Sequence, residues 1–216
     1  VDLMNPVLNQ KQLAEKLHPF FKPIVIESTD STSTWVRSHL HVLAEGTVLF
    51  AREQTAGRGR GSHSFTSNKD CGLYLTLLLK PAGGQDIFLP VSLKTAAAAA
   101  HALTNLYGVP VGIKWVNDLM IENRKIGGIL CESVPLSKGR QALMIGIGIN
   151  VCSQQFPGSL QNTAASLQDF VPEAGLNETA AALLNTLYEF LQDPDESSIH
   201  KIYKDHFILA GRTVTV

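Results

Sequence analysis

The sequence has 216 residues, of which 44% are hydrophobic and 17% are charged, and its formal net charge is −1. A chain of this length can bury a substantial core, and its composition excludes an intrinsically disordered protein. The near-zero charge also excludes a basic field over the whole molecule that would attract nucleic acid or an anionic membrane.

The first two thirds of the chain consists mainly of short strand-like runs. After a first run at Ile24–Glu27, the segment Asp30–Ser33 is predicted to cap a helix that carries Trp35 and Leu40. Its hydroxyl groups could also bind a polar ligand if the helix N-terminus lines a cleft. Further strands are expected at Thr47–Arg52, Gly72–Leu79, Val111–Trp115, Leu119–Ile121, Ile126–Glu132 and Leu143–Val151.

Helices are expected between and after these strands. An alanine-rich apolar stripe predicts a helix over Leu89–Tyr107, and a turn at residues 122–124 indicates a hairpin. Asn177 is predicted to cap a later helix with one apolar face, formed by Ala180, Leu183, Leu184, Leu187 and Leu191. Residues 213–216 resemble a strand that is cut short. Strands followed by helices predict an α+β fold with a mixed β-sheet and helices packed on one side.

The segment Gln54–Asp70 has no apolar period, and long segments of this kind are usually functional or mobile loops. It contains Gly57-Arg58-Gly59-Arg60-Gly61, in which glycines let the backbone approach a ligand and two guanidinium groups can bind carboxylate or phosphate. The pattern is neither a dinucleotide fingerprint nor a P-loop. A solvated flexible loop and an RNA-binding segment remain alternatives from this pattern alone.

Three later motifs also place cations or bare backbone at strand ends. The first motif, Lys114-Trp115-Val116-Asn117-Asp118, lies at the end of a strand. The ammonium of Lys114 either reaches a phosphate in a cleft or lies in solvent beside a turn. Arg124–Leu130 contains two glycines after a basic pair, which indicates a close ligand or a solvated hairpin tip. In Ile145–Asn150 glycine alternates with isoleucine, which leaves one strand face bare for a flat ligand or a packed neighbour.

The sequence contains no Ser-His-Asp order and no metal-ligand cluster, and the pair His39 and His41 is typical of surface histidines. The cationic groups and exposed backbone suit anionic phosphates better than covalent catalysis.

In this order, the motifs at Asp30–Ser33, Gln54–Arg60, Lys114–Asp118, Arg124–Leu130 and Gly146–Asn150 resemble those of bacterial biotin–protein ligases. The resemblance covers residues 24–151, and the helical remainder up to Ala210 is similar to the rest of the family's catalytic domain. It implies the biotin/lipoate ligase-like fold.

The resemblance implies an enzyme with two half-reactions. The carboxylate of biotin attacks the α-phosphate of ATP, which gives biotinyl-5′-AMP and pyrophosphate, and a lysine of a biotin carboxyl carrier protein then attacks the mixed anhydride. The acetyl-CoA carboxylase carrier domain is the implied partner. Biotin, ATP and magnesium are the implied small molecules, with no protein ligand assigned to the metal.

The motif match also assigns residues. Those implied to bind biotin are Ser31, Thr32, Ser33, Gln54, Gly57, Arg58, Gly59, Arg60, Lys114, Gly128, Gly146 and Gly148. Those implied to bind ATP are Arg58, Arg60, Phe65, Lys114, Asn117, Lys125 and Asn150, with Asn150 at the adenine and Lys125 at a phosphate. Lys114, Arg58 and Arg60 are the implied catalytic residues.

The sequence departs from the family pattern at several positions. Ser33 replaces an asparagine and Val116 a proline, and Gly61-Ser62-His63-Ser64-Phe65 replaces a second arginine cluster and a tryptophan. Fewer arginines and a smaller ring are expected to weaken adenylate retention and adenine stacking.

The ends of the chain carry further expectations. Residues 1–210 are predicted to form the catalytic domain and 211–216 the start of a truncated or missing C-terminal β-barrel. The segment before Ile24 is too short for a winged helix-turn-helix, so no direct DNA binding is expected.

The cysteines and the lack of a targeting segment predict where the protein is located. The three cysteines suit a reducing compartment, and the absence of a signal peptide or apolar span predicts a cytoplasmic protein without membrane contact. A homodimer is left open. A lipoate or octanoate transferase of the same fold is the alternative enzyme, and an RNA-binding module is the alternative from another class.

Overall fold

The computed structural model describes residues 7–61, 63–81, 88–115, 117–193 and 195–211. Within these ranges the chain forms one seven-stranded sheet with the order β1-β2-β3-β7-β6-β5-β4. The strands are β1 (Lys22–Thr29), β2 (Thr47–Gln54), β3 (Gly72–Leu79), β4 (Gly112–Lys114), β5 (Asp118–Ile121), β6 (Arg124–Pro135) and β7 (Gln141–Asn150). β1 and β2 are parallel and the other neighbours are antiparallel, so the predicted mixed sheet is confirmed. The expectations for Ser62, Val116 and residues 213–216 fall outside the described residues.

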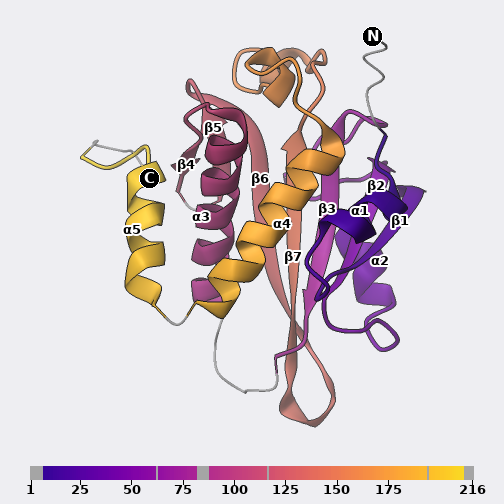
Figure 1. The fold of residues 1–216 in the computed structure, drawn as a ribbon. Helices are drawn as coiled ribbons and strands as arrows, with labels where there is room; N and C mark the ends of the chain where they lie inside the picture. The colour runs from indigo at the N-terminus through magenta and orange to yellow at the C-terminus, as the bar shows by residue number, and fades with distance from the viewer. Residues whose placement is uncertain (1–6, 62, 82–87, 116, 194, 212–216) are drawn as a thin grey trace.

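Most α-helices of the described residues lie on one side of this sheet, as predicted (Figure 1). They are α1 (Gln10–Lys16), α3 (Phe88–Tyr107), α4 (Leu176–Gln192) and α5 (Glu196–His206). The side chains from Ala96 to Ala100 are fully buried, and their small size lets α3 pack closely in the main core. Three short 3-10 helices are η1 (Ser137–Gly139), η2 (Gly158–Leu160) and η3 (Leu167–Asp169).

One short helix, α2 (Thr32–Ser38), lies on the opposite face of the sheet, where Val36 packs with Leu49 and Leu78 in a second, smaller core. Side chains of a strand alternate between its two faces. In β3, Leu77 therefore belongs to the main core and Leu78 to the core under α2. Thr76 is fully buried on the α2 side, and this is the face on which polar groups gather.

The predicted hairpin between β5 and β6 is confirmed, and the predicted cap of α2 is confirmed in position only. Glu122 and Asn123 have φ values of 47° and 62°, which is the left-handed pair that a two-residue hairpin turn needs between β5 and β6. Ser31 occupies the N-cap position of α2, as predicted, but its side chain makes no capping bond. The helix ends at Ser38, so Leu40 lies just beyond it.

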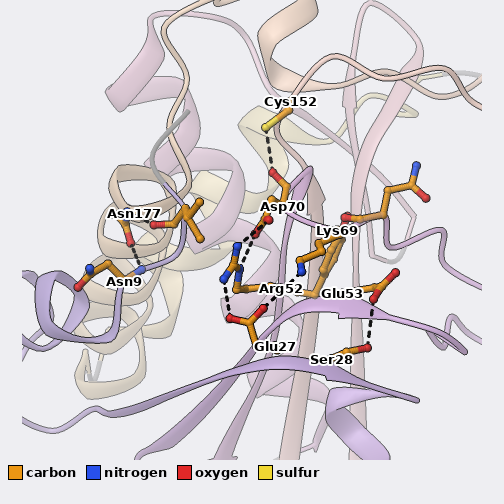
Figure 2. A network of polar contacts seen from close by, with 12 residues as sticks. Asn9, Glu27, Ser28, Arg52, Glu53, Lys69, Asp70, Cys152 and Asn177 are labelled. Carbon is orange, nitrogen blue, oxygen red and sulfur yellow. Dashed lines mark hydrogen bonds and ion pairs between the residues drawn. The ribbon is translucent and has the colours of Figure 1, made fainter. Parts of the chain in front are cut away.

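The predicted cap at Asn177 is wrong. Gly175 is the N-cap of α4, and Asn177 lies within the helix with its side chain fully buried. Its amide oxygen accepts the backbone N–H of Asn9 at 3.0 Å, and its amide nitrogen donates to the carbonyl of Val7 at 3.2 Å (Figure 2). Burial of an amide requires partners, and here these come from the other end of the chain.

Candidate active site

Two adjoining cavities lie on the sheet face that carries α2. The first has a volume of about 360 Å³ and the second about 260 Å³. Ser64, Phe65, Asp118 and Lys125 line both cavities and therefore mark the boundary between them.

The first cavity collects most of the residues predicted to bind biotin. Its lining includes Ser31, Thr32, Ser33, Gln54, Arg58, Gly59, Arg60, Gly128, Gly146 and Gly148. The three glycines of β6 and β7 form part of its floor, so the bare strand face predicted from the Gly-Ile alternation leaves room here. At Gly148 that room is taken by a neighbour, because an added Cβ would lie 2.8 Å from the ring of Phe65.

The second cavity contains four of the residues predicted to bind ATP. Phe65, Lys114, Lys125 and Asn150 line it. Asn150 is buried, and its amide donates to the carbonyl of Ala165 at 3.1 Å. The ammonium of Lys125 lies 2.6 Å from the carboxylate of Asp118 at the boundary of the two cavities. A cation thus stands where ligands in the two cavities would meet.

Five predicted residues lie elsewhere than expected, and two of them, Arg58 and Arg60, line only the first cavity although they were assigned to both ligands. Lys114 lines only the second cavity, because it ends the edge strand β4, two strands away from β6. Asn117 lines only the first, where its side chain donates to the carbonyl of Ile129 and ties the β4–β5 connection to β6. Gly57 lines neither, because its backbone packs against Phe65 so closely that a Cβ would lie 2.4 Å from the Phe65 carbonyl oxygen.

One end of the first cavity is built by a chain of side-chain hydrogen bonds. The hydroxyl of Thr76 donates to that of Thr32 at 2.9 Å, and the Thr32 hydroxyl and N–H both donate to Oε1 of Gln54, at 3.1 and 2.8 Å. The amide nitrogen of Gln54 donates to Ser67 at 2.8 Å. Because both Thr32 donors meet the same oxygen, the amide orientation of Gln54 is fixed.

The ligand loop, residues 55–69, carries the Gly-Arg motif into the first cavity. Phe65 donates its backbone N–H to Gly57 at 2.9 Å, and Gly59 donates to His63 at 2.8 Å, so the two limbs of the loop pair with each other. Arg58 and Arg60 are exposed and line the cavity. Both guanidinium groups are therefore open to an anionic ligand.

An ion-pair network lies at the base of the ligand loop (Figure 2). Arg52 contacts Asp70 and Glu27, and Lys69 contacts Glu27 at 3.5 Å. Hydrogen bonds from Arg52 hold the pKa of the Asp70 carboxyl below its usual range. The loop is thus anchored where it leaves and rejoins the sheet.

Several residues of the site were not predicted from the sequence, among them Thr76, Ser67, Asp118 and Glu132. Thr76 carried a signal, since it is the one aliphatic hydroxyl residue in the apolar run Gly72–Leu79. Asp118 is the last residue of the motif Lys114–Asp118, but the motif gave no role for its carboxylate. Ser67 and Glu132 had no local signal, because their contacts depend on the fold.

The described parts of the chain contain neither a membrane-spanning helix nor a cluster of metal ligands. No helix there is long and apolar enough to cross a membrane. Nor do these residues contain a group of three or more His, Cys, Asp or Glu side chains that could hold a metal ion.

Comparison with known proteins places this architecture in a family. The model of the biotin/lipoate A/B protein ligase family matches residues 25–150. The bifunctional ligase/repressor BirA of Bacillus spizizenii is 36% identical over 150 residues, which cover 66% of this chain and 44% of the relative. The protein of the same name from Escherichia coli is 31% identical over 182 residues, which cover 82% of this chain and 55% of the relative. The chain spans about half the length of these curated relatives.

A solved structure shares the fold. The biotin protein ligase of Aquifex aeolicus, in complex with biotin and ATP, superposes with a TM-score of 0.76 at 27% identity and covers 87% of this chain and 78% of that one. The family model matches more than half of the sequence, including both ends of the first cavity. This chain belongs to the biotin/lipoate A/B protein ligase family.

Proposed function

We propose that this protein activates biotin with ATP to biotinyl-5′-AMP and transfers biotin to a lysine of a biotin carboxyl carrier protein, such as the acetyl-CoA carboxylase carrier domain. The solved relative that binds biotin and ATP supports the choice of substrates. Two adjoining cavities, with the ion pair of Lys125 and Asp118 at their boundary, suit an acid and a nucleotide that must react with each other.

The hydrogen-bond chain at the end of the first cavity is the observation that favours biotin over lipoate. The ureido ring of biotin has two N–H donors and a carbonyl acceptor, whereas the dithiolane ring of lipoate has neither. The Thr32 hydroxyl already donates to Gln54, so it can only accept a further bond from a ligand. A dithiolane ring has no N–H to donate to this oxygen, which keeps only its bonds to Thr76 and Gln54. Lipoate therefore lacks a hydrogen bond that biotin can make, a difference of about 0.5–1.5 kcal/mol.

The reaction would occur at the boundary of the two cavities. A carboxylate oxygen of biotin attacks the α-phosphorus of ATP, and the bond from that phosphorus to the pyrophosphate oxygen breaks. Lys114 and Lys125 would stabilise negative charge on the phosphates, and Arg58 and Arg60 would bind the carboxylate and the adenylate. In the second step the amine of the carrier lysine attacks the acyl carbon, loses a proton and displaces AMP.

The proposal also includes a metal ion and a location in the cell. Magnesium is expected to arrive with the phosphates of ATP, which would supply its oxygen ligands. The cytoplasmic location stays a prediction from the sequence, and a homodimer is left open.

Biotin-dependent ATP–pyrophosphate exchange tests the proposal, with lipoate offered as the control acid. We expect exchange with biotin only, and a loss of about 100-fold or more in Lys114→Ala. Lys201→Ala is the matched control, because Lys201 is an exposed lysine on α5, away from both cavities. A folded wild-type protein without exchange would overturn the proposal, and exchange with lipoate but not biotin would assign the other branch of the family.

A further inference from the structure

Glu132 lies on β6 immediately beyond the first cavity. Gly128 and Leu130 line that cavity, and Glu132 is the next residue on the same strand face. Glu132 itself does not line either cavity, and its side chain is only 17% exposed. A carboxylate is therefore held beside the binding site without reaching into it.

Two arginines from different parts of the chain share this carboxylate. Arg58, in the ligand loop, places Nη2 3.2 Å from Oε1 and Nη1 3.4 Å from Oε2. Arg37, on α2, places Nη2 2.8 Å from the same Oε1. A carboxylate oxygen has two lone pairs, so Oε1 accepts from both arginines at the same time.

The same guanidinium of Arg58 also faces the cavity. Its Nη1 lies 3.4 Å from the hydroxyl of Ser33, which lines the first cavity. A guanidinium has five N–H donors in a rigid plane, so contacts with Glu132 on one edge leave other donors for a ligand. A two-point contact also restricts the rotation of a long side chain that is otherwise exposed.

We propose that Glu132 is a positioning residue that orients Arg58 for the acid bound in the first cavity. The inference rests on the proposed function for the identity of that acid. Removing the charge of Glu132 leaves Arg58 present but free to rotate into solvent. The ligand must then order it on binding, which weakens ground-state and transition-state binding alike.

Kinetics of the exchange reaction test the proposal. Glu132→Gln, which keeps the size of the side chain, should raise the KM for biotin about threefold to tenfold and leave kcat nearly unchanged, a size typical of partly exposed charged pairs. Glu132→Asp should restore part of the loss. In an Arg58→Ala background, Glu132→Gln should add no further change, because the two residues act through one contact.

Arg37→Ala is the matched control, because it also breaks an ion pair of Glu132. It should leave the KM for biotin unchanged, since the two contacts between Arg58 and Glu132 remain. An increase equal to that of Glu132→Gln would show that Glu132 acts by tying α2 to β6, and would overturn the proposal. An unchanged KM in Glu132→Gln would overturn it as well.

Chemical modification separates this inference from the proposed function. Phenylglyoxal labelling followed by peptide mass spectrometry reports the accessibility of Arg58, with the neighbouring exposed Arg60 as reference. Labelling of Arg58 relative to Arg60 should rise several-fold in Glu132→Gln. If wild-type protein shows no exchange but labelling of Arg58 rises in Glu132→Gln, the proposed function is wrong and the contact between Glu132 and Arg58 is confirmed. If exchange occurs but neither the labelling nor the KM rises in Glu132→Gln, only the positioning role is wrong.

Discussion

Arg52 and Asp70 form a two-point ion pair across the base of the ligand loop. Nε of Arg52 lies 2.7 Å from Oδ1 and Nη2 lies 2.8 Å from Oδ2, and the backbone N–H of Asp70 also donates to the carbonyl of Arg52 at 2.9 Å (Figure 2). Asp70 has a φ of 56°, in the left-handed region. Two separate features, a charge and a turn conformation, therefore meet in one residue.

Asp70→Asn separates these features, because asparagine tolerates the left-handed region but carries no charge. We expect the melting temperature at pH 7 to fall by roughly 2–6 °C, through loss of charge-assisted hydrogen bonds. Thermal unfolding between pH 3 and 8 measures this difference.

The pH dependence of that difference follows from the pKa of Asp70. Arg52 lowers this pKa in the folded protein from an ordinary value of 3.8, so the stabilisation is fully present above about pH 4. It is lost as the pH falls through the folded pKa, where Asp70 becomes protonated. The wild-type and variant curves should therefore run parallel from pH 5 to 8 and converge below about pH 4. Convergence at neutral pH would contradict this account.

Gly148→Ala should affect ATP as well as biotin, because Gly148 lines the first cavity and its neighbour Phe65 lines both. The added methyl group would lie 2.8 Å from Phe65, so the ring must move away from the boundary of the two cavities. We expect the KM for ATP to rise about threefold to tenfold, with little loss of stability because the ring is only half-buried. Gly146→Ala is the matched control. Its Cβ would lie 3.3 Å from the Leu130 carbonyl in the first cavity, so biotin should be the substrate affected.

Asn177→Ala should destabilise the fold without changing the chemistry. It removes two buried hydrogen bonds that hold the segment at Asn9, at a cost of about 1–3 kcal/mol in the free energy of unfolding. Asn185 makes the same kind of pair, with the N–H of His18 at 2.8 Å and the carbonyl of Lys16 at 3.0 Å, in a more exposed position. Asn185→Ala should therefore cost about 0.5 kcal/mol or less, as measured by urea unfolding. Equal losses would show that burial does not decide the difference.

Local patterns in the sequence determined much of the fold. The β-strands follow from short apolar runs, and the hairpin between β5 and β6 from two residues that tolerate a positive φ. Glycine and arginine at Gly57–Gly61 indicated a loop that can bind an anionic ligand, although the same pattern also suits a solvated loop or an RNA-binding segment. Such inferences need only neighbours along the chain.

The tertiary structure alone decided which polar groups act together. Thr32 meets Thr76 across 44 positions of sequence, Arg58 meets Glu132 across 74, and Asn9 meets Asn177 across 168. A buried donor or acceptor must find a partner, but strand order and register determine which partner is within reach. For the same reason Lys114 lies in the second cavity: its position is set by the place of β4 at the edge of the sheet, which no local pattern encodes.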